Sequence, residues 1–178
     1  MRTLKWAVLS VGLLSASVAG AKGWGRGHGG GHKHGPQHQD ECTAFYGPFS
    51  SQTGEPCESP IGLCTHGALE GEFPAQYDFT FETMESANDP NDPTKFVYTG
   101  YSVVTARDGS GIAYTDDTGV IHMTESGPAP FVTKAIIVDG TKKFANADGG
   151  FVATGNLTFE NGQAIGAYSA VICKPKRR

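Results

Sequence analysis

Apolar and polar residues alternate with a period of two along much of the chain. The clearest case is Gln76 to Met84, where Tyr77, Phe79 and Phe81 are separated by single polar residues. Successive side chains of a strand point to opposite faces, so this pattern predicts a strand with one apolar face. Outside the N-terminal leader, no window of the sequence shows the i, i+3, i+4, i+7 spacing of an amphipathic helix.

Seven further segments have a strand pattern and are bounded by turn signals rich in Gly, Pro, Asn and Asp. Together the eight predicted strands are Cys64 to Gly71, Gln76 to Met84, Phe96 to Ala106, Ile112 to Thr118, Gly119 to Glu125, Phe131 to Val138, Gly150 to Phe159 and Ala164 to Cys173. Eight antiparallel strands with short turns form a closed barrel or a sandwich, and closure removes exposed edges. We therefore predict an all-β, eight-stranded antiparallel closed barrel over residues 63–173.

Residues 1–21 have the organisation of a signal peptide. A short basic start, Met1 to Lys5, is followed by an apolar run from Trp6 to Val18 and by small residues up to Ala21. The apolar run is short for a membrane span, so we predict cleavage after Ala21 and export, with an uncleaved anchor as the alternative. The mature chain would then be secreted or periplasmic and would keep no integral membrane segment.

Residues 22–39 form a polar tail rich in glycine and histidine, which has too few apolar side chains to fold alone. Its histidines are candidate ligands for a weak Zn²⁺, Cu²⁺ or Ni²⁺ site: His28, His32, His34 and His38. The alternative, which we favour, is a disordered spacer, because no rigid element would hold the ligand geometry. The oxygens of residues 88–93 could hold Ca²⁺, but two Asx-Pro turns explain this loop without an ion.

The charge is unevenly distributed. Between Asp40 and Cys173 there are 18 acidic and 5 basic residues, a balance of −13. An acidic body repels phosphate, which argues against nucleic acid as a partner. Residues 174–178 form a basic tail, which we interpret as a solvated end, with binding to an anionic surface as the alternative.

Four cysteines in an exported chain predict two disulfides: Cys42, Cys57, Cys64 and Cys173. Loop-closure entropy does not separate the possible pairings. Barrel closure slightly favours Cys64–Cys173, because these residues begin and end the predicted barrel. Residues 40–62 are rich in Gly-Pro and Ser-Pro signals and are expected to form an irregular arm.

No nucleophile elbow, phosphate loop or zinc-protease motif is present, and the catalytic residues stay unknown. The polar candidates are Glu82, Asp116, Asp117, His122 and Glu125, with Tyr98, Tyr101 and Tyr114 as donors. On a strand, neighbours such as Asp116 and Asp117 face opposite ways, which makes them poor local pairs. Tyr77, Phe79 and Phe81 are expected to line the barrel interior, either as ordinary core or as a weak ligand-binding site.

One turn carries a resemblance to a known superfamily. Gly140-Thr141-x-x-Phe144-x-x-Ala147-x-Gly149 resembles the G-T-G-x-F-x-x-A-x-G turn of allene oxide cyclases and dirigent proteins. Lys142 stands where these families have their second glycine, a position at which positive φ would strain a lysine. The segments Cys57 to Thr65 and Ile172 to Pro175 resemble the ends of exported bacterial members of the same superfamily.

The resemblance implies a calycin-like barrel, often trimeric, with a central cavity for an apolar molecule. Two classes of function follow. The first is an exported binding or scaffold barrel, whose interior is packed or holds a small apolar ligand. The second is an allene oxide cyclase-like or dirigent-like enzyme that guides cyclisation or coupling of an apolar substrate. An enzyme of this kind needs a cavity of roughly 300 Å³ and a buried polar group that faces it.

Overall fold

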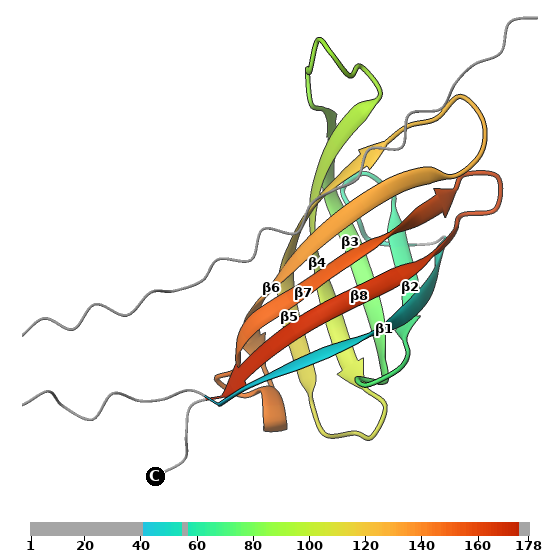
Figure 1. The fold of residues 1–178 in the computed structure, drawn as a ribbon. Coiled ribbons are helices and arrows are strands. Elements are labelled where there is room, and N and C mark those ends of the chain that lie inside the picture. The colour runs from blue at the N-terminus through green and yellow to red at the C-terminus, as the bar shows by residue number, and fades with distance from the viewer. Residues whose placement is uncertain (1–40, 55–56, 175–178) are drawn as a thin grey trace, which may run out of the picture. The chain divides into compact units, whose positions relative to one another are not determined.

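The computed structural model of the protein describes residues 41–54 and 57–174, and these residues form one closed antiparallel barrel (Figure 1). The strands are β1 (Glu41–Gly54), β2 (Cys64–Leu69), β3 (Ala75–Ser86), β4 (Lys95–Ala106), β5 (Ile112–His122), β6 (Ala129–Gly140), β7 (Asp148–Thr158) and β8 (Gln163–Lys174). Each strand pairs with its neighbours in sequence, and β1 pairs with β8 to close the barrel. The predicted fold class is confirmed.

The predicted strands were wrong at two places. The expected irregular arm of residues 40–62 contains β1, the longest strand. Pro48 has no N–H group to donate, and its carbonyl accepts a hydrogen bond of 2.9 Å from the Glu70 N–H, just past the end of β2. Conversely, the segments Ile112 to Thr118 and Gly119 to Glu125 are one strand, β5, which ends at His122.

The disulfides join Cys42 to Cys173 and Cys57 to Cys64. The preference for Cys64–Cys173 was therefore wrong, although closure of the barrel does bring a cysteine beside Cys173. The first strand of the barrel is β1 and not β2, so Cys42 lies opposite Cys173 in the β1–β8 ladder. The two disulfides lie at opposite ends of the barrel, since Cys57–Cys64 bridges the β1–β2 connection.

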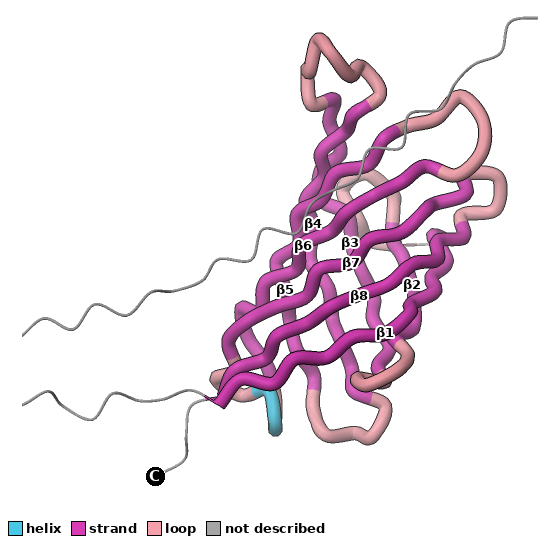
Figure 2. The backbone as a smooth tube through the Cα atoms, in the orientation of Figure 1, coloured by secondary structure: helices cyan, strands magenta, loops and turns pink. Residues whose placement is uncertain are grey.

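An aromatic plug, defined as Phe45, Phe73 and Phe144, closes the end of the barrel at which β1 begins and β8 finishes. Phe73 comes from the β2–β3 loop, and its ring centroid lies 5.5 Å from that of Phe45 and 5.8 Å from that of Phe144. Phe144 is 1% exposed. The same end carries the single helical turn η1 (Lys142–Phe144), drawn in cyan in Figure 2. The three rings therefore pack across this end of the barrel, next to a pocket of about 650 Å³ whose other lining residues include Arg107 and Lys143.

The turn that carries Phe144 contains the lysine that departs from the family pattern. Lys142 has a φ of 50°, in the left-handed region that glycine adopts at low cost. Its Nζ donates a hydrogen bond of 2.8 Å to the carbonyl of Gly109 in the β4–β5 turn. A lysine therefore holds the conformation that a glycine would otherwise supply, and its side chain ties two turns together.

The predicted leader, the histidine-rich tail of residues 22–39 and residues 175–178 lie outside the described residues. In the part of the chain that the structure describes, no helix has the length and apolar character to cross a membrane.

Candidate ligand-binding site

The barrel encloses a cavity of about 120 Å³ between the aromatic plug and the opposite end. All eight strands contribute to its wall. The lining residues include Ser51, Tyr77, Phe79, Phe81, Tyr98, Ser102, Thr115, Asp117, Thr133 and Ala153. Tyr77, Phe79 and Phe81 thus lie in the interior, where the period-two pattern placed them. Their role in binding a ligand stays a prediction.

Glycines on neighbouring strands make room for the aromatic rings of the wall. A Cβ atom on Gly67 would overlap the ring of Tyr77, and one on Gly119 would overlap the ring of Tyr98. Tyr77 is the cross-strand partner of Gly67, and Tyr98 is the partner of Gly119. Each ring therefore lies flat over its neighbouring strand instead of filling the centre of the barrel. This arrangement keeps part of the interior open.

The rings of the wall contact one another at one side of the cavity. The centroid of Phe81 lies 4.4 Å from that of Phe79 and 5.4 Å from that of Tyr98. Contacts of this kind are favourable beyond the burial of their area, and they hold the ring positions. The wall is therefore a set of fixed aromatic surfaces.

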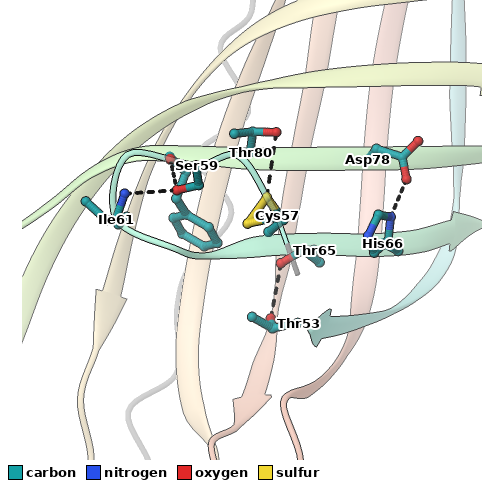
Figure 3. The surroundings of a disulfide bond; sticks show 10 residues. Thr53, Cys57, Ser59, Ile61, Thr65, His66, Asp78 and Thr80 are labelled. Atoms are coloured by element: carbon teal, nitrogen blue, oxygen red, sulfur yellow. Dashed lines mark hydrogen bonds and ion pairs between the residues drawn. A yellow bond between two sulfur atoms is a disulfide. The ribbon is translucent and has the colours of Figure 1, made fainter. Parts of the chain in front are cut away.

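Part of the β1–β2 connection is drawn in Figure 3, with Cys57, Ser59 and Ile61 labelled, and this connection holds Phe81 in place. The Ser59 hydroxyl donates to the Phe81 carbonyl over 2.5 Å, and the Phe81 N–H donates to the Leu63 carbonyl over 3.1 Å. The Cys57–Cys64 disulfide closes the same connection. Phe81, a residue of the cavity wall, is thus positioned by a short cross-linked loop.

Asp117 places a carboxyl group in this largely apolar wall. Its side chain projects inward from β5 and the residue is 4% exposed. One carboxyl oxygen accepts a hydrogen bond of 2.6 Å from Thr115, and the other accepts one from Ser102 on β4. Burial raises the pKa of Asp117 to about 6, and the two hydroxyl groups oppose that rise. The carboxyl group can therefore exchange a proton near neutral pH.

Two phenols lie near this carboxyl group. The Tyr98 hydroxyl is 2.6 Å from the Thr133 hydroxyl, and burial raises the pKa of Tyr98 to about 12. Burial also raises the pKa of Tyr77, while the Ser51 side chain beside it acts in the opposite direction. The charge of Asp117 contributes to the raised pKa of both phenols. Both phenols stay protonated at neutral pH and can donate or accept a hydrogen bond.

The other polar candidates lie away from the cavity. Glu82, Asp116, Glu125, Tyr101 and Tyr114 are exposed on the outer surface or in a loop. His122 is paired with Asp92 of the β3–β4 loop at 2.8 Å, so it is a satisfied surface group. Of the predicted candidates, the structure brings only Asp117, Tyr98 and the three aromatic residues of β3 to one site.

The described residues contain no ligand set of the kind that holds a metal ion. Among the described residues, no three His, Cys, Asp or Glu side chains converge in a way that could hold an ion. The four histidines proposed as weak ligands lie outside those residues. In the β3–β4 loop, Asp89 and Asp92 accept hydrogen bonds from the backbone N–H groups of Asn91 and Thr94, which accounts for these carboxyl groups as turn formers.

Sequence reasoning missed the polar partners of the site. Ser102 and Thr115 were not singled out, although Thr115 and Asp117 occupy the same face of β5 as the buried residues Ala113 and Ile121. The glycine at position 119 was interpreted as a break, and that break hid the continuous alternation. With one unbroken strand, the pattern would have placed Asp117 inside.

No protein-family model and no curated protein matches the chain. Among solved structures, the barrel is similar to a pterocarpan synthase dirigent protein, with a TM-score of 0.45 and 17% sequence identity over 79% of this chain and 94% of that chain. The similarity is one of fold, and the barrel assignment above depends on the strand pairing alone.

Proposed function

We propose that the protein is an exported binding barrel whose interior holds a small, mostly apolar molecule. The observation that carries this proposal is the cavity of about 120 Å³, lined by aromatic rings and by a few polar groups. Binding sites commonly combine an apolar wall with a small number of placed polar groups. The two disulfides support residence in an oxidising compartment.

The cavity sets the size of the ligand. An apolar cavity of about 150 Å³ accommodates benzene in an engineered protein. The present cavity is of similar size, so the ligand would be a single ring or a short chain, or a longer molecule whose end remains outside. This volume is well below the roughly 300 Å³ expected for an enzyme that folds a large substrate.

Binding can be tested with benzyl alcohol as the probe, followed by changes in the amide NMR spectrum of the labelled protein. We expect saturable shifts for residues of the wall. Ala153→Phe should abolish them, because the new ring would fill the cavity. Val97→Phe is the matched control, since Val97 is 40% exposed on the outer face of β4. Equal binding by both variants, or no saturable shift in the wild type, contradicts the proposal.

A second candidate function is a dirigent-like or cyclase-like enzyme. The observation that favours it is the buried carboxyl group of Asp117, which faces the cavity with a pKa of about 6 and can act as a general acid or base. We would oxidise a phenol with a one-electron oxidant and measure the enantiomeric ratio of the coupled product. A racemic product in the presence of the protein counts against this function and leaves the binding function intact.

The family resemblance also leads us to propose a homotrimer. Support comes from apolar side chains exposed on the outer faces of β6, β7 and β8: Val132, Ile136, Val138, Val152, Ile165 and Val171. Exposed apolar patches of this kind commonly mark contact surfaces. Sedimentation equilibrium measures the mass directly, and a monomer at micromolar concentration contradicts the trimer.

A further inference from the structure

Asp117 is a buried carboxyl group with no cationic partner. None of the described residues that line the cavity is Lys, Arg or His. The ionisable residues of the wall are Asp117 and the phenols of Tyr77, Tyr98 and Tyr168. Buried charges in proteins are normally paired, because an isolated charge loses its hydration without compensation. The site therefore lacks the positive group that would complete it.

The carboxyl group also has unused capacity as an acceptor. An ionised carboxylate offers about four acceptor positions. The hydroxyl groups of Ser102 and Thr115 occupy one position on each oxygen. Asp117 is nevertheless part of the cavity wall. A donor with several N–H groups could bind to the remaining positions without displacing either hydroxyl.

The surrounding rings suit the same kind of ligand. A contiguous aromatic wall is formed by Phe79, Phe81 and Tyr98. The charge of Asp117 contributes to the raised pKa of Tyr98, so the carboxyl group lies close to this wall. Aromatic faces attract cations, and they also pack against apolar groups. A carboxylate beside aromatic rings is thus complementary to a molecule that carries a positive amine at one end and an apolar group at the other.

We propose that the cavity binds a small primary amine, with its ammonium group against Asp117 and a single ring or short chain among the aromatic residues. This inference rests on the proposed binding function and specifies the chemistry of its ligand. The volume of about 120 Å³ limits the apolar part to roughly one ring. The balance of −13 between Asp40 and Cys173 would also raise the local concentration of cations around the barrel.

Binding of such a ligand should depend on pH through one group. Facing Asp117 are Ser102 and Tyr98 from β4, Tyr77 from β3, and Thr133 and Ala135 from β6. The phenols, including Tyr168 across the barrel, have pKa values raised by burial and stay neutral. Asp116, the adjacent charged residue, lies on the outer face and acts only through its charge. Asp117 is therefore the group that titrates near neutral pH.

The experiment compares benzylamine with benzyl alcohol, which has similar size and no charge. Both are titrated into the full protein at pH 5 and pH 7.5, with NMR as the readout. A carboxyl group with a pKa of about 6 is about one tenth ionised at pH 5 and almost fully ionised at pH 7.5. We expect the affinity for benzylamine to rise about tenfold between these values, while that for benzyl alcohol does not rise.

Two variants test whether Asp117 causes the pH dependence of benzylamine binding. Asp117→Asn keeps the shape of the side chain and should weaken benzylamine binding about tenfold to a hundredfold, while the pH dependence disappears. Asp116→Asn removes an equal charge from the neighbouring residue on the outer face and should retain the affinity and its pH dependence. Binding of benzyl alcohol to Asp117→Asn shows that this variant has kept its cavity.

The outcomes separate this inference from the proposed function. If benzyl alcohol binds and benzylamine shows no gain at pH 7.5, the amine inference is wrong and the binding barrel stands. The same holds if the two Asp variants weaken benzylamine equally. If neither probe enters the wild-type protein, the binding function itself is wrong. Should Asp117→Asn not fold, the comparison of the two probes in the wild type decides alone.

Discussion

The two ends of this barrel differ in what fills the interior. At the plug end, Phe45, Phe73 and Phe144 pack against one another, and Cys42–Cys173 joins the first strand to the last. Towards the opposite end, the interior holds a cavity with a buried carboxyl group and two phenols. There the disulfide closes only a short connection.

One end of the barrel mainly stabilises the fold and the other holds the candidate binding site, although both belong to one sheet. The plug packs apolar rings against one another, so its residues mainly stabilise the fold. The pocket of about 650 Å³ at this end is lined largely by polar and charged side chains, unlike the aromatic wall of the cavity. The cavity half retains open volume and a buried carboxyl group with no cationic partner among the described residues, and both features reduce stability. Features that cost stability in a folded protein are often those on which function depends.

The largest expected difference between the two ends concerns the disulfides. Cys42–Cys173 spans 131 residues, so replacing both with serine should lower the free energy of unfolding by about 5 kcal/mol. Cys57–Cys64 spans 7 residues, and the same change there should cost about 2.5 kcal/mol. Urea unfolding of the two double variants measures both. Equal losses would show that the strand-closing disulfide has no special role at the plug end.

The second expected difference concerns the aromatic residues. Phe144→Ala should lower the free energy of unfolding by about 3 to 5 kcal/mol, because it removes a fully buried ring from the plug. Phe81→Ala, which removes a half-buried ring from the cavity wall, should cost about half of that or less. Urea unfolding gives the stabilities, and a benzyl alcohol titration gives the binding. We expect weaker binding in the Phe81 variant; if the Phe144 variant, while folded, loses binding as strongly, the two ends do not have separate roles.

The third expected effect concerns the pH dependence of stability. The folded state holds the Asp117 proton up to a pKa of about 6, whereas the unfolded chain releases it near the ordinary pKa of 3.8. Ionisation therefore favours the unfolded state as pH rises from about 4 to 6, and the wild type loses up to about 3 kcal/mol. Asp117→Asn removes this loss, so its stability relative to the wild type should grow by that amount between pH 4 and pH 7.

The control for this effect is Asp116→Asn, which removes a carboxyl group from the outer face of the same strand. Chemical unfolding at several pH values provides the measurement. A constant difference between the wild type and Asp117→Asn across this range would mean that the buried carboxyl group titrates normally in the folded protein.

The inward face of β3 and the presence of two disulfides could be predicted from the sequence. The alternation from Gln76 to Met84 placed Tyr77, Phe79 and Phe81 on an inward face, because a strand has a period of two whatever surrounds it. The four cysteines predicted two disulfides, but their pairing was not predictable. Their partners depend on which strand closes the barrel, and the Gly-Pro signals around Pro48 made that strand resemble a loop.

Gly119 shows why a local sequence pattern did not predict the candidate ligand-binding site. In the sequence, Gly119 resembles a turn that ends a strand. In the barrel it is an interior position that must lack a Cβ, because the ring of Tyr98 from β4 lies over it. The reason for the glycine is a contact with another strand, and a local reading contains no information about that contact.

By itself, the sequence determined the class of fold, the aromatic face of β3 and the number of cross-links, because each of these follows from local spacing or from composition. Tertiary structure alone decided which cysteines pair, that β1 completes the barrel, and that Asp117 shares a cavity with Tyr77 and Tyr98. Those outcomes depend on the register between strands, which is set when all eight strands close on one another.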